Sequence, residues 1–424
     1  MRKLNHNRFI SLREKYPVFT YESYHFTIKE DNTVEVVFHF RIGPDIDFRP
    51  VYIMNAGKYA LQHLHKDEID GIVFHIGMVE MISYWKATCS PQILIRPFTL
   101  TVAQQKWWKK LFWHGLGEFL YQNSIETDEE QLVSFCFEQG TESSGNFQYH
   151  AVIDSNRVLV PVGGGKDSVV TLESLRHNRE IIPFIINPRQ ATLECARVAG
   201  FDSREDMVLL KRMIDPLLLE LNNRDFLNGH TPFSAMLAFW SLLASHMTGT
   251  REIALSNESS ANEPTIPGTS INHQYSKSLE FELDFRDYVR QYMGDIAHYY
   301  SFLRPYNEWQ IAELFSRYPD YFPVFKSCNS GSKEDKWCCD CSKCLFTYII
   351  LSPFLEEKEL IAIFGEDLLD KPSLVHYFDE LTGLAEVKPF ECVGTLEEVN
   401  RAIQAVKDKY KDKYLIQHYI NHKS

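Results

Sequence analysis

The order of apolar and polar residues near the start of the chain predicts a sheet. Within residues 16–56 the clearest segment is Thr33–Ile42 (TVEVVFHFRI), where apolar and polar residues alternate as in a strand with one buried face. From Gly77 to Tyr121 the apolar residues instead recur at helical spacing. We therefore expect an N-terminal α+β region in which an antiparallel sheet is followed by helices.

The middle of the chain predicts alternating strands and helices. An apolar strand over 157–162 is followed by a helix over 168–178 and a second apolar strand over 180–187. This spacing is typical of a right-handed βαβ unit in a parallel sheet, so the fold class is α/β. The remaining predicted elements are three helices and one strand, over residues 192–199, 214–223, 231–248 and 252–256.

A polar, turn-rich segment over residues 123–155 separates these two patterns and marks a domain junction. A chain of 424 residues with 44% hydrophobic content can bury large cores, and its length suggests two or three domains. We predict an N-terminal α+β domain over 1–150, an α/β domain with a parallel sheet over 151–320, and a helical C-terminal region with a cysteine cluster over 321–424.

Charge and hydropathy restrict the partners of the chain. A net charge of −13 argues against a nucleic-acid binder with a broadly basic surface. No run of eighteen apolar residues occurs, and the first residues (MRKLNHNR) lack the apolar core of a signal peptide. We expect a cytoplasmic protein that binds neither nucleic acid nor membrane. Nine partly clustered cysteines then favour metal binding or free thiols over disulfides.

Three glycines interrupt the apolar segment Val158–Val170 (VLVPVGGGKDSVV) between a strand and a helix. Consecutive glycines let the backbone turn sharply and expose N–H groups, and the helix N-terminus adds partial positive charge, so the loop suits a phosphate. Lys166 and Ser168 add a charged and a polar contact. Val160 and Asp167 depart from the Walker A pattern. The alternative is a glycine-rich turn without a ligand.

The residues from Gly163 to Ser168 resemble the loop Ser-Gly-Gly-x-Asp-Ser of the ATP pyrophosphatase (PP-loop) superfamily, except that Gly163 replaces the first serine. Enzymes with this loop grip the β,γ-diphosphate of ATP and transfer AMP to an oxygen of a carboxylate, amide or carbonyl group. The resemblance implies that the α/β domain binds ATP with Mg²⁺, which Asp167 could hold. The residues expected to bind the nucleotide, its metal or the substrate are Gly163, Gly164, Gly165, Lys166, Asp167, Ser168, Asn187, Ser256, Asn257 and Glu258.

Five of the nine cysteines lie within the seventeen residues from Cys328 to Cys344. Two overlapping Cys-x-x-Cys steps and one upstream cysteine can wrap a tetrahedral Zn²⁺ ion. We predict a structural zinc site formed by Cys328, Cys338, Cys341 and Cys344, with no position open to a substrate. Cys339 is the fifth cysteine and is expected not to bind the ion, but Cys339 as a ligand is kept as an alternative. An iron–sulfur cluster or a set of reduced thiols is the alternative.

Several ordered blocks resemble one enzyme family, the UDP-N-acetyl-α-D-muramoyl-L-alanyl-L-glutamate epimerases. The resemblance covers roughly residues 70–395 and is far more specific than any single motif. Besides the phosphate loop and the cysteine cluster, the blocks are Gly77–Pro91 (GMVEMISYWKATCSP), Leu227–Pro232 (LNGHTP), Leu255–Glu258 (LSNE), Asn272–Ser278 (NHQYSKS) and Lys388–Gly394 (KPFECVG).

This resemblance implies an enzyme of peptidoglycan precursor synthesis whose partner is a small-molecule UDP-muramoyl dipeptide. Such an enzyme uses ATP and a divalent metal, inverts the terminal L-glutamate to D-glutamate, and releases AMP and diphosphate. The candidates for proton transfer, which lie in the resembling blocks and have suitable chemistry, are His230, His273, Lys277 and Cys392. Each has a structural alternative, respectively a turn cap, a core group, a surface charge and a small buried side chain. The oligomeric state stays open.

A second interpretation keeps the adenylation and changes the fate of the activated carboxylate. Ammonia or an amine would capture it, which gives a nitrile, an amide or a peptide bond. The cysteine cluster also resembles the zinc knot of the queuosine-pathway synthase that converts a carboxylate to a nitrile. A deuterium-exchange experiment separates the two, because only epimerisation breaks a bond at the glutamate α-carbon.

Overall fold

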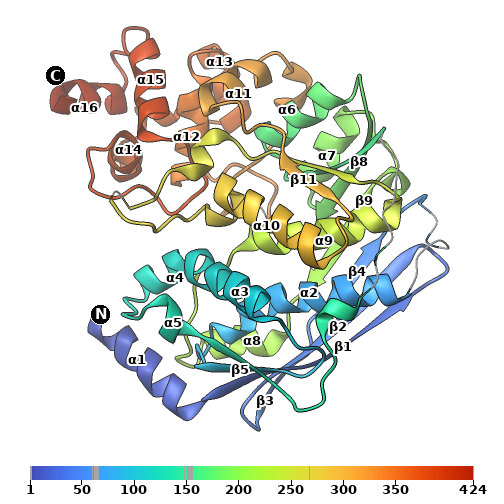
Figure 1. Ribbon diagram of the computed structural model, residues 1–424. Helices are drawn as coiled ribbons and strands as arrows, with labels where there is room; N and C mark the ends of the chain where they lie inside the picture. The colour runs from blue at the N-terminus through green and yellow to red at the C-terminus, as the bar shows by residue number, and fades with distance from the viewer. Residues whose placement is uncertain are drawn as a thin grey trace. The chain divides into compact units, whose positions relative to one another are not determined.

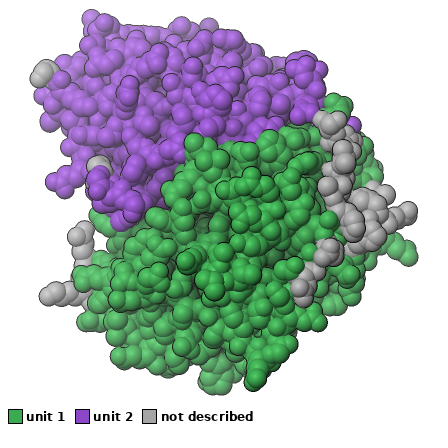
Figure 2. All heavy atoms as spheres, in the orientation of Figure 1, with its two compact units in different colours: residues 1–159, 204–253, 275–299 green, residues 160–203, 254–274, 300–424 purple. Residues whose placement is uncertain are grey.

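The computed structural model is a mixed α/β fold with a large sheet, and it describes residues 2–59, 61, 66–147, 149, 156–266, 268–331 and 333–423 (Figure 1). Its contacts divide the chain into two compact units. Unit 1 comprises residues 1–159, 204–253 and 275–299, and unit 2 comprises residues 160–203, 254–274 and 300–424 (Figure 2). The domain boundary predicted after residue 150 lies outside the described residues, and the division into three domains stays a prediction.

The strands near the N-terminus belong to unit 1 and form the antiparallel sheet expected over residues 16–56. Strand β2 pairs antiparallel with β1, β3 and β4, and Val34 lies opposite both Ile28 and Met54. The side chains of Val36, Phe38 and Phe40 on β2 are fully buried, as the alternation predicts. The strands are β1 (Val18–Ile28), β2 (Thr33–Ile42), β3 (Ile46–Phe48), β4 (Val51–Asn55), β5 (Gln92–Ile95), β6 (Ser134–Phe137) and β9 (Val208–Met213).

Helix α2 of unit 1 packs closely against strands β1 and β2 of this sheet. A Cβ atom on Gly77 of helix α2 would lie 1.9 Å from the hydroxyl oxygen of Tyr21 on β1, so only glycine permits this approach. The helices are α1 (Arg2–Lys15), α2 (Lys66–Trp85), α3 (Val102–Gly115), α4 (Gly117–Gln122), α5 (Glu129–Leu132), α8 (Pro216–Asn222), α9 (Phe233–Thr248) and α10 (Leu279–Tyr292). None of the described helices combines the length and apolar composition needed to cross a bilayer.

Three strands of unit 1, β5, β6 and β9, were not predicted. Strand β6 lies within residues 123–155, where the sequence predicted only a polar, turn-rich junction. The helical prediction from Gly77 to Tyr121 was wrong at β5, which pairs in parallel with both β1 and β6. Its four residues lie between Pro91 and Pro97, and a strand this short shows no alternation. Strand β9 pairs antiparallel with β4. Its last residues, Lys211 to Met213, are polar or only partly buried, which weakens the apolar pattern.

The region that begins at Arg157 follows the predicted order of elements. Strand β7 (Arg157–Pro161) leads through the glycines into α6 (Lys166–Leu175), β8 (Glu180–Ile186) and α7 (Gln190–Val198). The strand order is β11-β10-β7-β8, where β10 is Glu252–Leu255 and β11 is His298–Ser301. β10 pairs in parallel with β7. Five consecutive residues of β8 are buried, which explains its continuous apolar sequence.

The C-terminal part of unit 2 is helical. Its helices are α11 (Glu308–Phe315), α12 (Ser342–Leu351), α13 (Glu357–Phe364), α14 (Val375–Thr382), α15 (Leu396–Val406) and α16 (Tyr414–Lys423). Helix α15 is strongly amphipathic, and its buried face includes Val399, Ala402 and Ile403. It begins at Thr395, whose hydroxyl accepts from the backbone N–H of Glu398, while the Glu398 carboxylate accepts from the N–H of Thr395.

Candidate active site

The three glycines form an open loop at the start of α6. Gly164 has a φ of +81°, and a Cβ atom there would lie 3.1 Å from the backbone nitrogen of Thr192. A Cβ atom on Gly163 would meet no described atom within 4 Å. The N-cap of α6 is Gly165, which has no side chain to accept from the first-turn N–H groups. These groups are therefore suited to a phosphate, as the sequence predicts.

Lys166 and Asp167 follow the glycines, and Lys166 is buried between two carboxylates. Its ammonium group lies 2.5 Å from Oδ1 of Asp167 and forms a second, short ion pair with Glu308 of α11. Burial disfavours the charged lysine, but the two carboxylates outweigh it and raise the pKa of Lys166 above its usual value. Lys166 is therefore charged at neutral pH.

A third carboxylate completes this cluster. Oxygen atoms of Asp167, Glu258 and Glu308 all lie within 4.8 Å of one another. Glu258 is 4% and Glu308 is 3% exposed. Three carboxylates with one lysine leave an excess of negative charge in a buried place, and burial raises the pKa of Glu308. Oxygen ligands of this kind suit Mg²⁺, which would let all three carboxylates stay ionised.

The elements around the loop fix these carboxylates. Glu308 is the first residue of α11, after the N-cap Asn307, whose side chain accepts from the N–H of Gln310. The backbone N–H of Glu308 donates to the carboxylate of Glu398 at 2.8 Å. Glu258 follows β10, and Arg304 donates to its carbonyl oxygen at 2.7 Å. The cluster thus depends on the ends of three separate elements.

The other residues predicted to contact the nucleotide or substrate follow strands. Asn187 comes directly after β8, is exposed and has a φ of +48°. Ser256 and Asn257 come directly after β10, and the Asn257 amide donates to the hydroxyl of Ser301 at 3.1 Å. Ser168 donates to the carbonyl of Gly165 at 2.9 Å. The ends of parallel strands are where α/β sheets bind ligands.

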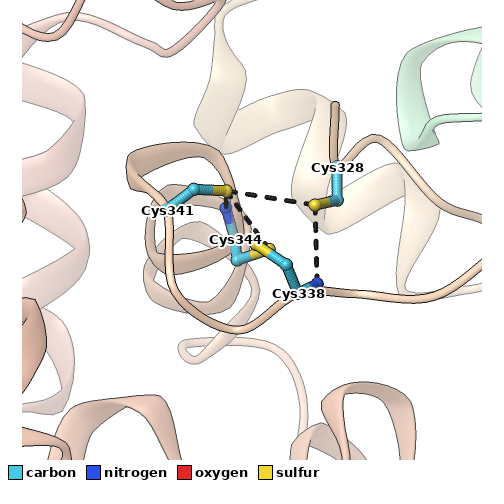
Figure 3. Close-up of side chains that lie close together, drawn as sticks. All are labelled: Cys328, Cys338, Cys341 and Cys344. Atoms are coloured by element: carbon cyan, nitrogen blue, oxygen red, sulfur yellow. Dashed lines mark hydrogen bonds between the residues drawn. The ribbon is translucent and has the colours of Figure 1, made fainter. Parts of the chain in front are cut away.

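The four cysteines predicted to bind zinc lie together (Figure 3). The sulfur of Cys341 lies 4.0 Å from that of Cys328 and 3.5 Å from that of Cys344, and Cys338 lies 3.7 Å from Cys344. Four thiolates around a tetrahedral zinc ion are separated by about 3.8 Å, given a Zn–S bond of about 2.3 Å. The donor set therefore fits a tetrahedral metal ion.

Backbone N–H groups surround these sulfurs, and Cys339 turns away from them. Gly331 donates to the sulfur of Cys328 at 3.1 Å, and Asp340 donates to that of Cys338 at 3.4 Å. The thiol of Cys339 instead donates to the carbonyl of Phe364 at 3.1 Å, and Cys339 has a φ of +54°. This left-handed backbone places consecutive cysteines on different sides of the loop.

The four candidates for proton transfer divide between the units. His230 and Lys277 belong to unit 1, and His273 and Cys392 belong to unit 2. All four side chains are partly buried. His230 has the most developed surroundings, because its Nδ1 lies 3.4 Å from the carboxylate of Glu118 on α4. A histidine beside a carboxylate is a common arrangement for a general base.

A buried lysine supports the loop that carries His230. Lys86 donates a short hydrogen bond to the carbonyl of Gly229. Burial and the nearby charge of Arg212 lower the pKa of Lys86 to about 8. Arg212 in turn pairs with buried Glu80 at 2.7 Å. Unit 1 therefore places several titratable groups around residues 229 and 230.

Comparison with known proteins identifies the family. Residues 11–302 match the MurL N-terminal domain, and residues 324–423 match the MurL C-terminal domain. The chain belongs to the MurL family. The glycine loop and Glu258 lie in the first matched range, and the cysteine cluster lies in the second. Glu308 lies between the two.

Curated relatives match over most of the chain. A UDP-N-acetyl-α-D-muramoyl-L-alanyl-L-glutamate epimerase of Salinispora tropica is 33% identical over 90% of this chain and 82% of its own length. Epimerases of the same name from Xanthomonas oryzae and a Micromonospora species are each 31% identical, over 91% and 93% of this chain and 85% and 88% of theirs. No solved structure matches the chain.

Sequence reasoning about this MurL-family chain missed three residues of these clusters. Glu308 looks like an ordinary acidic residue in the first turn of a helix, where it would favour the helix dipole. Glu118 occupies the same kind of position in α4. Lys86 stands in the resembling block Gly77–Pro91, and this was the one signal that could have drawn attention to it.

Proposed function

We propose that the protein is an ATP-dependent epimerase of peptidoglycan precursor synthesis in the cytoplasm. It inverts the terminal L-glutamate of UDP-N-acetyl-α-D-muramoyl-L-alanyl-L-glutamate to D-glutamate. Membership of the MurL family, with both of its domains matched, carries this proposal. The glycine loop beside a buried carboxylate cluster supports the use of a nucleotide and a divalent metal.

The activating step makes the α-proton removable. A free glutamate carboxylate resists loss of this proton, because the resulting carbanion would stand beside an existing negative charge. In the proposed reaction the carboxylate oxygen attacks the α-phosphorus of ATP, the bond to the β-phosphate oxygen breaks, and diphosphate leaves. The mixed anhydride with AMP is uncharged at the acyl group and acidifies the α-carbon. In this proposal the phosphate loop serves the epimerisation by binding ATP, because adenylation removes the negative charge of the glutamate carboxylate.

The phosphate loop and the carboxylate cluster divide this work. The loop belongs to the PP-loop superfamily in our proposal, and the N–H groups of Gly164 and Gly165 and the hydroxyl of Ser168 bind the β,γ-diphosphate. Lys166 opposes the charge that develops on the leaving diphosphate. Asp167, Glu258 and Glu308 hold Mg²⁺, which neutralises phosphate charge when bound. Asn187 lies near the adenosine, and Ser256 and Asn257 contact ribose or substrate.

The second step moves one proton and consumes one water. A base removes the α-proton of the acyl-adenylate, and a proton returns to the opposite face. Water then attacks the acyl carbon and releases AMP and the UDP-muramoyl dipeptide, which now ends in D-glutamate. His230 with Glu118 is the first candidate for the base, because their contact can orient the imidazole and stabilise its protonated form. His273, Lys277 and Cys392 are the candidates for the acid that returns a proton to the opposite face.

The cysteine cluster holds a structural Zn²⁺ in this proposal.

Incubation in deuterated water tests the proposal. The protein is mixed with ATP, Mg²⁺ and the UDP-muramoyl dipeptide, and the product is hydrolysed and analysed for chirality and deuterium. We expect D-glutamate with one deuterium at the α-carbon, together with AMP and diphosphate. Omission of ATP should leave both chirality and isotope unchanged. Unlabelled L-glutamate in the complete reaction, or an amide or nitrile product with ammonia, would refute the epimerase assignment.

A further inference from the structure

The segment that carries the first metal-binding cysteine lies directly against the phosphate loop. The backbone N–H of Lys326 donates to the carbonyl of Gly164 at 2.8 Å. The next residue, Ser327, packs its Cβ 3.2 Å from the position that a Cβ on Gly165 would occupy. Cys328 follows immediately. The polypeptide that enters the cysteine cluster is therefore one wall of the glycine loop.

A second contact reaches the loop through helix α7. Asp335 stands between Cys328 and Cys338, and its Oδ1 accepts from the backbone N–H of Ala191 at 2.8 Å. Ala191 lies in the first turn of α7, where N–H groups have no partner within the helix. The backbone of Ala191 and Thr192 is also the surface that Gly164 touches. Asp335 thus caps, from outside, the helix that supports Gly164.

The cysteine cluster fixes both ends of this segment. The sulfur of Cys328 accepts from the N–H groups of Gly331 and Cys338, at 3.1 and 3.5 Å. A Cβ on Gly331 would lie 2.1 Å from the carbonyl oxygen of Lys336, so the turn permits only glycine there. Thiolates held by one ion would hold Lys326 and Asp335 at fixed positions relative to each other.

The other end of the cluster leads to Lys166. Cys341 is the N-cap of α12, and Cys344 lies in its first turn. On the same helix, the ring of Phe346 lies 5.9 Å from the ammonium group of Lys166. A Cβ on Gly394 would lie 3.0 Å from Phe346 and 3.1 Å from Glu308. The cluster therefore adjoins the phosphate loop from two directions.

We propose that the segment Lys326–Cys338 is a positioning element for ATP: with its cysteines bound to metal, it holds Gly164 and the N-terminus of α7 in the conformation that accepts the diphosphate. This inference rests on the proposed use of ATP. The zinc site then has a second role beyond stability, because its occupancy sets the affinity of a loop more than 160 residues earlier in the chain. Asp335 acts through α7 and is a positioning residue.

Two substitutions of Asp335 separate the hydrogen bond from the backbone. Asp335 has a φ of +51°, a conformation that both glycine and asparagine tolerate. Asp335→Gly removes the acceptor without strain, and Asp335→Asn keeps an acceptor oxygen. Asp225→Gly is the matched control, because Asp225 has a φ of +61° and lies exposed in unit 1. All three variants retain the four metal-binding cysteines.

The measurements are zinc content, the Kd for ATP with Mg²⁺ by equilibrium dialysis, and hydrogen exchange of peptides that contain residues 163–169. For Asp335→Gly we expect full zinc content, an ATP Kd raised by about fivefold, and faster exchange in the loop. Asp335→Asn and Asp225→Gly should bind ATP like the unaltered protein. Stepwise removal of zinc with a chelator should weaken ATP binding in proportion to the metal lost.

The outcomes distinguish this inference from the proposed function. If Asp335→Gly and Asp335→Asn bind ATP equally and the loop exchanges equally, the positioning role is wrong while ATP use stands. The same holds if the ATP Kd is independent of zinc content. If the unaltered, zinc-loaded protein binds no ATP, both the inference and the proposed ATP-dependent function fail.

Discussion

Glu308 forms a buried ion pair with Lys166, although 142 positions separate them in the sequence. The pair joins the first residue of α11 to the first residue of α6. The backbone of Glu308 is in turn tied to the N-terminus of α15 through Glu398. The glycine loop is therefore anchored by the start of three helices, and Glu308 is the residue that they share.

Replacement of Glu308 should weaken the binding of Mg²⁺ and slow the Mg²⁺-dependent release of diphosphate. Glu308→Gln keeps the shape and removes one of three clustered charges, so we expect diphosphate release to fall by about 100-fold and the apparent Mg²⁺ requirement to rise. Initial rates at graded Mg²⁺ concentrations measure both effects. Glu313→Gln on the same helix, which removes an exposed pair with Arg317, is the control. An unchanged rate at every Mg²⁺ concentration would contradict the metal site.

The glycines of the loop should differ sharply in tolerance. Gly164→Ala places a Cβ against the backbone of α7 and strains a positive φ, so ATP binding should fall by about tenfold or more. Gly163→Ser meets free space and restores the serine common in PP-loop enzymes. We expect its ATP affinity to equal or exceed that of the unaltered protein. Unchanged ATP binding in Gly164→Ala would show that the loop is not the phosphate site.

Metal content should depend on four cysteines and not on the fifth. Cys341→Ser removes a ligand and should abolish stoichiometric zinc, whereas Cys339→Ala should retain one ion per chain, because its thiol points to the Phe364 carbonyl. Elemental analysis gives the stoichiometry, and the visible spectrum distinguishes zinc from an iron–sulfur cluster. Loss of the ion in Cys339→Ala would reassign the ligand set.

The pair of His230 and Glu118 should separate the two proposed half-reactions. His230→Gln should lower deuterium exchange at the α-carbon by about 100-fold or more while diphosphate release stays within about threefold. Glu118→Gln should act in the same direction with a smaller effect, because Glu118 acts only through the imidazole. Exchange and diphosphate release are measured in the same reaction. A His230 variant with normal exchange would move the base to another candidate.

Because of Lys86, the free energy of unfolding should change with pH in the alkaline range. Burial lowers the pKa of Lys86 to about 8 from its usual 10.5, so between these values the unfolded chain binds more protons than the folded one. Stability therefore rises with pH across this window, by about 3 kcal/mol at most, and is lost again as pH falls through the folded pKa. Urea unfolding near pH 8 and near pH 10.5 measures the change. The slope should be smaller in Lys86→Met, and identical slopes would contradict the burial of this amine.

Local patterns in the sequence predicted local structure well. The alternation over Thr33–Ile42 became β2 with its apolar residues buried. The apolar strand, three glycines and helix became β7, the loop and α6, because each feature acts within a few residues. The four cysteines predicted from their spacing lie together for the same reason, since three of them fall within seven consecutive positions.

Contacts between residues that are far apart in the chain could not be predicted from the sequence. Glu308 carries no local sign of its partner Lys166, because a glutamate in the first turn of a helix is common in any role. Asp335 looks like one more charged residue in a turn, yet it caps a helix about 140 residues away. The strand β5 depends on neighbours before and after it in the chain, and its own four residues fit more than one structure.

The contact between Lys326 and Gly164 uses only backbone atoms. Every amino acid except proline carries the N–H that it needs. Position 326 can therefore change its side chain in the course of evolution while the contact persists. Saturation mutagenesis should therefore find that position 326 tolerates every residue except proline. The proposed nucleotide site would nevertheless depend on the backbone hydrogen bond at this position.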